Sequence, residues 1–331
     1  MIKNILITAF LVFTLNININ ANQNKTIAIA GPTASVSHPI FHMIKTDALK
    51  SLNTNIKFKQ WKNPDELKAL ILNKKVDFIA VPITAGSILY NRGADVQLLS
   101  LVMGGARGIV TSNRSIKTIK DLKGHSIGIA SRGGLADSLI KILLEKNGMD
   151  YKKDIKIVYT QNSKNSTLLL LKGKIDCAVL SEPRISMALK KAKSLPTDKT
   201  PHKLFFSINL LDTWKKTFNT NTSFAQVGFL AVGDTIKDKK LINIFIQEYK
   251  KSLNWYINNP DKSSKLASKY FKGLHPKAIK NGIKNSNLHI LTTQNDKKLI
   301  KELLNNLVKT NPKSMGGKLP DGGFYFKNNY K

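Results

Sequence analysis

The residues best suited to bind a ligand lie between a short apolar run and an amphipathic segment. The run 126–130 (SIGIA) has the pattern of a buried strand, and the loop Ser131–Gly134 (SRGG) follows it directly. Apolar positions then recur at helical spacing as far as Gly148. A strand that runs through two glycines into a helix predicts unencumbered N–H groups at the positive end of a helix dipole, where an anion or a polar oxygen binds. An ordinary strand-to-helix connection has the same pattern, so both interpretations stay open for this segment alone.

Polar side chains also follow the other predicted strands. In open α/β sheets ligands bind at the carboxyl ends of the strands, and an arginine there pairs through two hydrogen bonds with a carboxylate, a sulfonate or a nitrate. Glu182 either contacts the ligand or caps the helix that Pro183 begins. The predicted ligand-binding residues supply hydroxyls, an imidazole, guanidiniums, a carboxyl group and glycine N–H groups: Thr33, Ser35, His38, Thr84, Arg107, Ser131, Arg132, Gly133, Gly134, Ser163 and Glu182.

Motifs for catalysis or metal binding are weak in this chain. His38 and His42 are four residues apart, a spacing compatible with a metal on one helix face, but no acidic or cysteine partner is near them. We therefore expect no metal site and take His42 as a half-buried helix residue. The sequence contains no Walker loop or H-E-x-x-H, and its one G-x-S-x-G match, GHSIG at 124–128, leads into a predicted strand, so it is not the strand-to-helix elbow of a nucleophilic serine. We predict no catalytic residue and no cofactor, and a structural role for Asp77 and Asp176, which sit at strand starts.

Composition indicates a folded chain with a strongly basic surface. A length of 331 residues with 42% hydrophobic residues is enough for two domains of ordinary size. The formal net charge is +32, but the lysines are spread evenly, and no zinc-finger spacing or RNA-binding aromatic motif is present. We therefore expect no nucleic-acid partner, and a field that attracts anions. The single cysteine, Cys177, lies in an apolar run and is expected to be buried.

The N-terminus has the three parts of a secretory signal peptide. Lys3 gives a charged start, 5–15 (ILITAFLVFTL) is an apolar core too short to span a bilayer comfortably, and Ala21 is a small residue suited to cleavage. We expect residues 1–21 to be removed and the mature chain to be a soluble monomer in the periplasm. No later segment reaches about 18 consecutive apolar residues.

Strands and helices alternate at the spacing of parallel sheets that are covered by helices on both faces. The predicted strands are 26–30, 56–60, 76–81, 96–103, 108–111, 126–130, 155–159, 175–180, 204–208 and 224–232. The predicted helices are 39–52, 64–72, 83–91, 135–147, 163–171, 185–192, 241–259, 261–271, 276–282 and 296–308. The tail 315–331 has no period and is expected to pack as a loop against the first domain.

Two segments repeat one pattern, which suggests two lobes built on related plans. KKVDFIAVP at 74–82 resembles KGKIDCAVL at 172–180, and each follows a leucine-bearing helix. Asp77 and Asp176 occupy the same place in the two segments. Two unrelated short strands that each begin with lysines could match in this way by chance, so the similarity alone leaves a chance match open as the alternative.

The order and spacing of several pieces resemble the solute-binding proteins of ABC importers of the nitrate/sulfonate/taurine type. The pieces are KKVDFIAVP, VQLLSLVMGGARGIVTSN, IKTIKDLKGHSIGIASRGG, LLKGKIDCAVLSEP and FAQVGFLAVGDTIKD, with a further echo in the tail LPDGGFYF. The resemblance covers about 26–260. It implies an α/β fold of the type 2 periplasmic binding protein class, with two mixed sheets flanked by helices and joined by two crossover strands near 105–110 and 225–232. Residues 25–106 and 230–331 would form lobe I, and residues 107–229 lobe II.

The same resemblance implies a function. The protein would hold a small polar or anionic solute between its lobes and deliver it to the permease and ATPase subunits of an ABC importer. The alternative is an enzyme on the same fold, similar to chorismate dehydratases or pyrimidine synthases. The signal peptide and the lack of a cysteine-rich iron motif or an acid/base pair oppose this alternative, and the sequence does not specify the solute.

Overall fold

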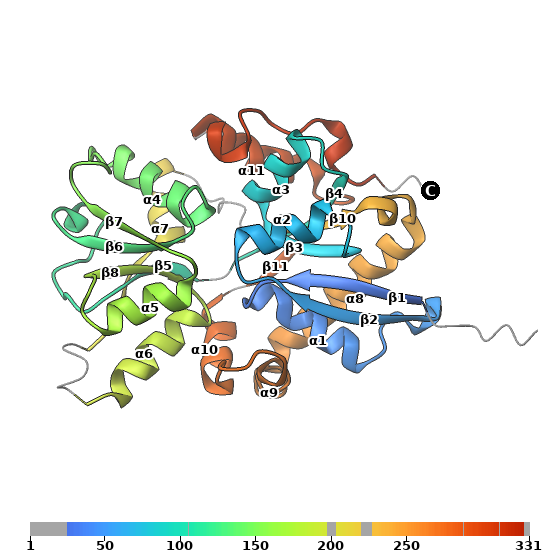
Figure 1. Ribbon diagram of the computed structural model, residues 1–331, viewed down its shortest axis with the longest axis horizontal. Helices are drawn as coiled ribbons and strands as arrows, with labels where there is room; N and C mark the ends of the chain where they lie inside the picture. The colour runs from blue at the N-terminus through green and yellow to red at the C-terminus, as the bar shows by residue number, and fades with distance from the viewer. Residues whose placement is uncertain are drawn as a thin grey trace, which may run out of the picture.

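The computed structural model describes residues 25–104, 106–196, 203–219, 227–286, 288–310 and 312–327. They form two β-sheets, each flanked by helices, which follow one another along the longest axis of the molecule (Figure 1). The predicted signal peptide 1–21 lies outside the described residues.

The first sheet has the strand order β11-β4-β10-β3-β1-β2. In it β1 is parallel to β2 and β3, whereas β10 is antiparallel to β3 and β4. The bounds are β1 (Lys25–Gly31), β2 (Thr54–Gln60), β3 (Phe78–Pro82), β4 (Val96–Met103), β10 (Val227–Val232) and β11 (His289–Thr292).

The second sheet has the strand order β7-β6-β8-β5-β9. Here β6 is parallel to β7 and β8, and β5 is antiparallel to β8 and β9. The bounds are β5 (Arg107–Thr111), β6 (Ser126–Ala130), β7 (Lys156–Thr160), β8 (Cys177–Ser181) and β9 (Phe205–Asn209). Cys177 is buried, as predicted.

The two sheets share one plan. The order β2-β1-β3-β10 in the first sheet matches β7-β6-β8-β5 in the second, with three parallel strands and then an antiparallel one. That antiparallel strand is in each case the first to follow the passage of the chain from the other sheet. The predicted fold class, two mixed sheets flanked by helices and joined by two crossover strands, is confirmed.

The two aspartates of the sequence echo make the same contacts. The Asp77 Oδ2 atom accepts a hydrogen bond from the backbone N–H of Ala28 at 2.7 Å, and Asp176 Oδ2 accepts one from Ser126 N–H at 2.7 Å. The backbone N–H of each aspartate donates to the carbonyl of that same neighbour. Each carboxylate therefore ties the start of one strand to the adjacent strand, which confirms the predicted structural role.

Replacing Asp77 with alanine is expected to lower the free energy of unfolding by about 2 kcal/mol, because Ala28 N–H and the Thr235 hydroxyl both lose a charged acceptor. Urea unfolding measures the change. Asp65→Ala, at an exposed position in the first turn of α2 (Pro64–Leu72), is the control and should change stability by less than about 0.5 kcal/mol. Equal losses in the two variants would contradict the assigned role.

Several elements begin and end where the sequence predicts, and α1 does not. The helices are α1 (His38–Lys45), α2 (Pro64–Leu72), α3 (Ile83–Asn91), α4 (Leu135–Lys146), α5 (Ser163–Leu171), α6 (Arg184–Ser194), α7 (Leu210–Phe218), α8 (Lys239–Asn258), α9 (Pro260–Tyr270), α10 (Pro276–Ser286) and α11 (Lys297–Thr310). The prediction that the first helix reaches residue 52 is wrong, because the chain turns at Asp47, whose φ is +47°. The sequence reading also missed α7 and β11.

Aromatic side chains join α8 to the first sheet. Phe245 stacks on Phe78 of β3 with 4.0 Å between ring centroids, and Tyr249 lies against Phe229 of β10 at 4.5 Å. The helix predicted at 241–259 is therefore present as an amphipathic helix, with its apolar positions buried.

The C-terminal tail packs on the first sheet, as predicted for a loop without periodicity. Tyr325 forms a parallel bridge with Leu98 of β4, and Phe326 N–H donates to the Leu98 carbonyl at 2.9 Å. The Tyr90 hydroxyl of α3 donates to Asp321 Oδ1 at 2.5 Å. Phe324 is wholly buried in this contact, so the tail belongs to the core.

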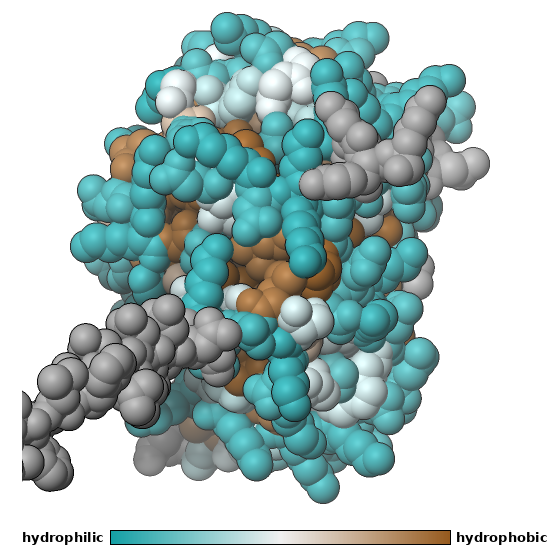
Figure 2. All heavy atoms as spheres, turned by 90° about the vertical axis from the view of Figure 1, so that its right-hand side faces the viewer, coloured by the Kyte–Doolittle hydropathy of each residue, from teal (hydrophilic) through white to brown (hydrophobic). Residues whose placement is uncertain are grey.

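The surface is predominantly hydrophilic. Figure 2 shows the right-hand side of Figure 1, where hydrophilic side chains cover most of the face and surround a central group of apolar ones. Within the described ranges, none of the helices combines the length and the apolar character that crossing a membrane requires.

Candidate ligand-binding site between the two sheets

Strand ends from the two sheets meet at a buried polar cluster. In Figure 1 the arrows of β1 and β2 point toward the second sheet. Ser35 and His38 follow β1, and Glu182 follows β8 of the second sheet. These three side chains and Tyr256 of α8 are each at most 6% exposed. Polar groups buried to this extent need hydrogen-bond partners within the protein.

The Tyr256 hydroxyl lies at the centre of this cluster. It is hydrogen-bonded to His38 Nδ1 at 2.8 Å and to the Ser35 side chain. Burial raises the pKa of Tyr256 far above its usual value, the Ser35 hydroxyl partly offsets the rise, and the nearby Glu182 carboxyl adds to it. Which group donates in the bond between the Tyr256 hydroxyl and His38 Nδ1 depends on the tautomer of the imidazole ring.

His38 is a neutral imidazole with one unsatisfied nitrogen. Burial lowers its pKa to about 3, so the ring carries no charge at physiological pH. The Tyr256 hydroxyl occupies Nδ1. Nε2 has no hydrogen-bond partner among the described residues. A buried polar atom left unpaired costs about 1–3 kcal/mol, so this ring nitrogen is the one that a polar atom of a bound molecule would satisfy most favourably.

Glu182 caps α6 and reaches across to α10. Its carboxyl oxygens accept hydrogen bonds from the backbone N–H and hydroxyl of Ser186, at 3.1 and 3.0 Å, and from Asn285 Nδ2 at 3.2 Å. Of the two sequence interpretations, the cap is the one that the geometry shows. Burial raises the pKa of Glu182, and these hydrogen bonds offset part of the rise.

Helix α10 lies between α6 and α9 in Figure 1, next to Glu182. A Cβ atom at Gly282 of α10 would be 3.3 Å from Glu182 Cβ and 3.4 Å from Pro183 Cα. Glycine therefore permits the close approach of α10 to the start of α6.

The N–H groups of the glycine loop are not free. Gly133 N–H donates to Asp137 Oδ2 at 2.7 Å, and Gly134 N–H donates to the Ser131 carbonyl at 3.2 Å. The prediction that both glycines offer unencumbered N–H groups is therefore wrong. Asp137, in the first turn of α4 and 1% exposed, accepts the Gly133 N–H that an external anion would otherwise use. Its other oxygen accepts from the Tyr159 hydroxyl at 2.9 Å.

The two candidate arginines differ in their surroundings. Arg132 is exposed, and its guanidinium lies 4.5 Å from the centre of the Tyr159 ring. Arg107 begins β5, where burial lowers its pKa to about 10, so it stays charged at neutral pH. Arg107 begins β5 and Arg132 follows β6, and both positions are at the end of the second sheet where Glu182 follows β8.

The remaining predicted residues lie at other strand ends. Thr33 Oγ1 accepts from Gln60 Nε2 at 2.5 Å, Thr84 is buried in the first turn of α3, and Ser163 opens α5. In the described parts of the chain, no hydrogen bond links these three to the Tyr256 cluster. Tyr256 was missed because it lies on the apolar face of a predicted helix, and Asn285 because it lies beyond residue 282, where the helix was predicted to end, whereas α10 runs on to Ser286.

His38 and His42 do not converge. His42 Nδ1 is hydrogen-bonded to Ser252 Oγ at 3.0 Å, and its ring stacks on Trp255 with 4.0 Å between centroids. His42 is half-buried, as predicted. Each imidazole therefore binds its own hydroxyl on α8. Across the described residues, no group of three or more ligating side chains is placed to hold a metal ion.

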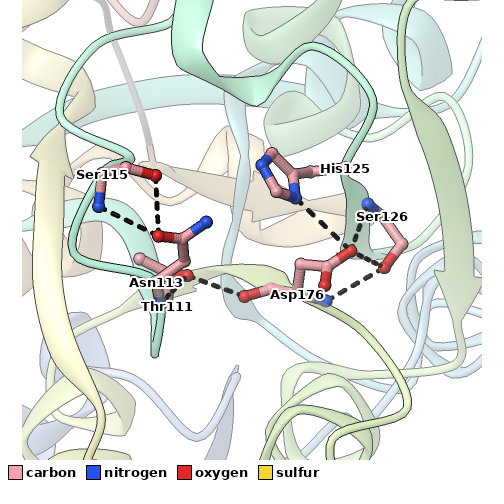
Figure 3. Close-up of polar contacts among 6 residues, drawn as sticks. All are labelled: Thr111, Asn113, Ser115, His125, Ser126 and Asp176. Carbon is pink, nitrogen blue, oxygen red and sulfur yellow. Dashed lines mark hydrogen bonds and ion pairs between the residues drawn. The ribbon is translucent and has the colours of Figure 1, made fainter.

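A serine, a histidine and an aspartate also meet at the amino ends of β6 and β8 (Figure 3). Ser126 Oγ donates to Asp176 Oδ2 at 2.6 Å, and His125 Nδ1 is 3.8 Å from that oxygen. A nucleophilic serine has to be hydrogen-bonded to the imidazole, whereas this one is bonded to the carboxylate. Despite partial burial, hydrogen bonds from Ser126 keep the pKa of Asp176 below its usual value. This cluster connects the start of β8 to the start of β6.

Comparisons with known proteins agree with this architecture. Three solved structures are similar: an ABC transporter protein from Parabacteroides distasonis (TM-score 0.72, 21% identity, covering 92% of this chain and 100% of that one), the aliphatic sulphonate binding protein SsuA from Escherichia coli (0.68, 16%, 88% and 94%), and the alkanesulfonate-binding protein SsuA from Xanthomonas axonopodis pv. citri bound to MOPS (0.64, 16%, 90% and 96%). No curated protein sequence matches the chain.

The two matching sheets and the polar cluster where their strands meet define a periplasmic binding protein fold of type 2, as the sequence predicts. The family model described as NMT1/THI5 like matches residues 50–263, which is more than half of the chain. The chain belongs to this NMT1/THI5-like family.

Proposed function

We propose that this protein is the solute-binding component of an ABC importer of the nitrate/sulfonate/taurine class. It holds a small polar or anionic solute between lobe I (25–106 and 230–331) and lobe II (107–229) and delivers it to the permease and ATPase subunits. The observation that carries the proposal is the buried, unpaired His38 Nε2 beside a polar cluster to which both sheets contribute. Similar folds include proteins described as binding sulfonates.

In this proposal the solute contacts come from both lobes. His38 Nε2 forms a hydrogen bond with an oxygen of the solute, and Ser35 stays engaged with Tyr256. Arg107 and Arg132 supply the positive charge that an oxyanion requires. Closure of the lobes would remove water from these groups and strengthen the interactions.

We also propose that the site binds without catalysis and that the protein works in the periplasm after removal of residues 1–21. Proton transfer needs a group whose pKa lies near the working pH. The pKa of His38 is lowered to about 3, which makes its ring a poor base at neutral pH. Three hydrogen bonds occupy Glu182. The roles of both residues are those of fixed polar contacts.

A solute screen tests the proposed function. Mature protein is mixed with nitrate, taurine, alkylsulfonates, bicarbonate or pyrimidine precursors, and the melting temperature is recorded. A solute at 100 times its Kd stabilises the folded state by about 2.7 kcal/mol, which gives a shift of several degrees. Failure of every solute to shift the melting temperature, with no small molecule copurifying by mass spectrometry, would contradict the proposal.

His38→Phe is expected to weaken the binding of that solute about tenfold or more, because the ring keeps its volume and loses the Nε2 atom. Isothermal titration calorimetry gives the affinity. His42→Phe is the matched control on the same helix. Its affinity for the solute should stay within about twofold of that of the unmodified protein, since the His42 ring bonds to Ser252 and not to the Tyr256 cluster. An unchanged affinity of His38→Phe would remove this residue from the site.

A further inference from the structure

A basic groove between α1 and α9 is not used by the proposed function. Its volume is about 570 Å³, and Lys45 of α1 forms one side. The other side is α9, which contributes Lys262, Lys265, Leu266, Lys269 and Tyr270. None of these residues belongs to the Tyr256 cluster. The wholly buried Phe41 lies between the two places, with ring centroids 6.5 Å from His38 and 4.1 Å from Tyr270.

The acid of α9, Asp261, offsets the positive charge of the groove only in part, since it lies near Lys265 but forms its ion pair outside the groove. Helical spacing places Lys262, Lys265 and Lys269 on one face, where like charges three or four residues apart repel. Asp261 is the acid of this helix, and it pairs with Lys280 at 2.6 Å. Among the described residues, no ion pair involves the four groove lysines. The groove therefore concentrates four ammonium groups that attract anions.

The floor of the groove is apolar and partly fixed. Tyr270 is 41% exposed, and its ring stacks parallel on Phe41, with an interplanar angle of 2°. Phe41 is held in the core, so the tyrosine ring is supported from below. Leu266, one turn earlier on α9, is half-buried beside it. An aromatic or aliphatic group that covers this floor gains contact area which a small inorganic ion does not provide.

We propose that this groove is a second ligand site, for an organic anion with at least two negative charges on an apolar or aromatic body. The lysines bind phosphate, sulfonate or carboxylate groups as point charges, and Tyr270 with Leu266 receives the apolar part. A volume of about 570 Å³ is within the range of small-molecule sites. This inference does not depend on the proposed transport function, because the two sites share no residue.

Three probes separate the two parts of the recognition. 1-Naphthyl phosphate carries both the charge and the aromatic body, 1-naphthol carries only the body, and inorganic phosphate only the charge. By calorimetry on the mature protein, we expect naphthyl phosphate to bind at least ten times more tightly than either of the other two. Equal affinity for inorganic phosphate would show a purely ionic surface and overturn the proposal.

Variants locate the binding. Lys265→Ala/Lys269→Ala should weaken naphthyl phosphate binding at least tenfold, and Tyr270→Ser should remove the preference over inorganic phosphate. Lys68→Ala/Lys172→Ala, at exposed positions outside the groove, changes the net charge equally and should have little effect. His38→Phe should also leave this binding unchanged. Loss of naphthyl phosphate binding in His38→Phe, with no loss in the groove variant, would place the probe in the interlobe site and overturn the proposal.

Vesicles distinguish a soluble ligand from a membrane surface. Sedimentation with phosphatidylglycerol vesicles is compared for the unmodified chain and Lys265→Ala/Lys269→Ala. If naphthyl phosphate does not bind while the vesicles bind only through these lysines, the groove is a membrane contact and the proposal is wrong. Naphthyl phosphate binding that the vesicles do not outcompete supports the proposed ligand site.

Discussion

The protein is expected to lose about 2 kcal/mol of stability between pH 7 and pH 5 through His38 alone. The pKa of this imidazole is lowered to about 3 in the folded state by burial, whereas an unfolded histidine titrates near 6.5. At pH 7 both states are neutral and the group contributes no pH dependence. As the pH falls below about 6.5, His38 becomes protonated in the unfolded chain and stays neutral in the folded chain. The free energy of unfolding therefore falls by up to about 1.4 kcal/mol per pH unit.

A substitution isolates this contribution from those of the carboxyl groups. His38→Gln removes the titrating group and keeps a polar side chain. From pH 7 to pH 5 the unfolding free energy of this variant should therefore drop less than that of the unmodified protein, by a difference of about 2 kcal/mol. His42→Gln is the matched control on α1, because its half-buried ring has a pKa that is also lowered by burial, and by less. Urea unfolding of the unmodified protein and the two variants at pH 5 and pH 7 gives the six free energies. Equal pH dependence with and without His38 would show that this ring is protonated in the fold.

The sequence predicted much of the fold because its strands and helices are marked by local signals. The runs at 96–103 and 126–130 became β4 and β6 with unchanged bounds, and the helix predicted at 64–72 became α2 with the same bounds. The failures have local causes too. Asp47 adopts a positive φ inside a segment with helical periodicity, and the pattern of apolar residues there does not indicate a turn. The strand β11 depends on its pairing with β4, which is a tertiary contact.

The site was predicted less completely, because it depends on contacts between distant segments. Ser35, His38 and Glu182 were identified from their positions after strands, and Ser35 and His38 do share a partner, Tyr256, with Glu182 near enough to affect its pKa. Tyr256 is more than 200 positions from His38, and its place on the buried face of α8 suggested packing alone. The prediction of free N–H groups at the glycine loop was wrong because of a contact that is local in sequence. Asp137 lies four residues after Gly133, and its position in the first turn of α4 was the available signal that a side chain of the protein itself binds the loop.

Asp137→Ala is expected to lower the free energy of unfolding by about 3 kcal/mol. The buried carboxylate accepts hydrogen bonds from Gly133 N–H, from the Tyr159 hydroxyl and from Lys141 Nζ at 3.0 Å, and alanine leaves these donors without that acceptor. Lys141 and Tyr159 are partly exposed and Gly133 is exposed, so the donors regain water, and the loss is that of three hydrogen bonds to a charged acceptor. Asp137→Asn keeps an acceptor for Gly133 and should lose about half as much. Urea unfolding at pH 7 measures each variant.

Asp212→Ala is the matched control, because Asp212 is also in the first turn of a helix, α7, but is exposed. Its loss should be below about 1 kcal/mol, which is what a carboxylate contributes at a helix N-terminus. The alanine variant at 137 has a second consequence, since it frees Gly133 N–H at the start of α4. If the carboxylate stands in for an anion, sulfate should stabilise Asp137→Ala more than the unmodified protein. Equal stabilisation of both by sulfate would mean that the loop rearranges without Asp137, and that the carboxylate shapes the loop rather than filling an anion position.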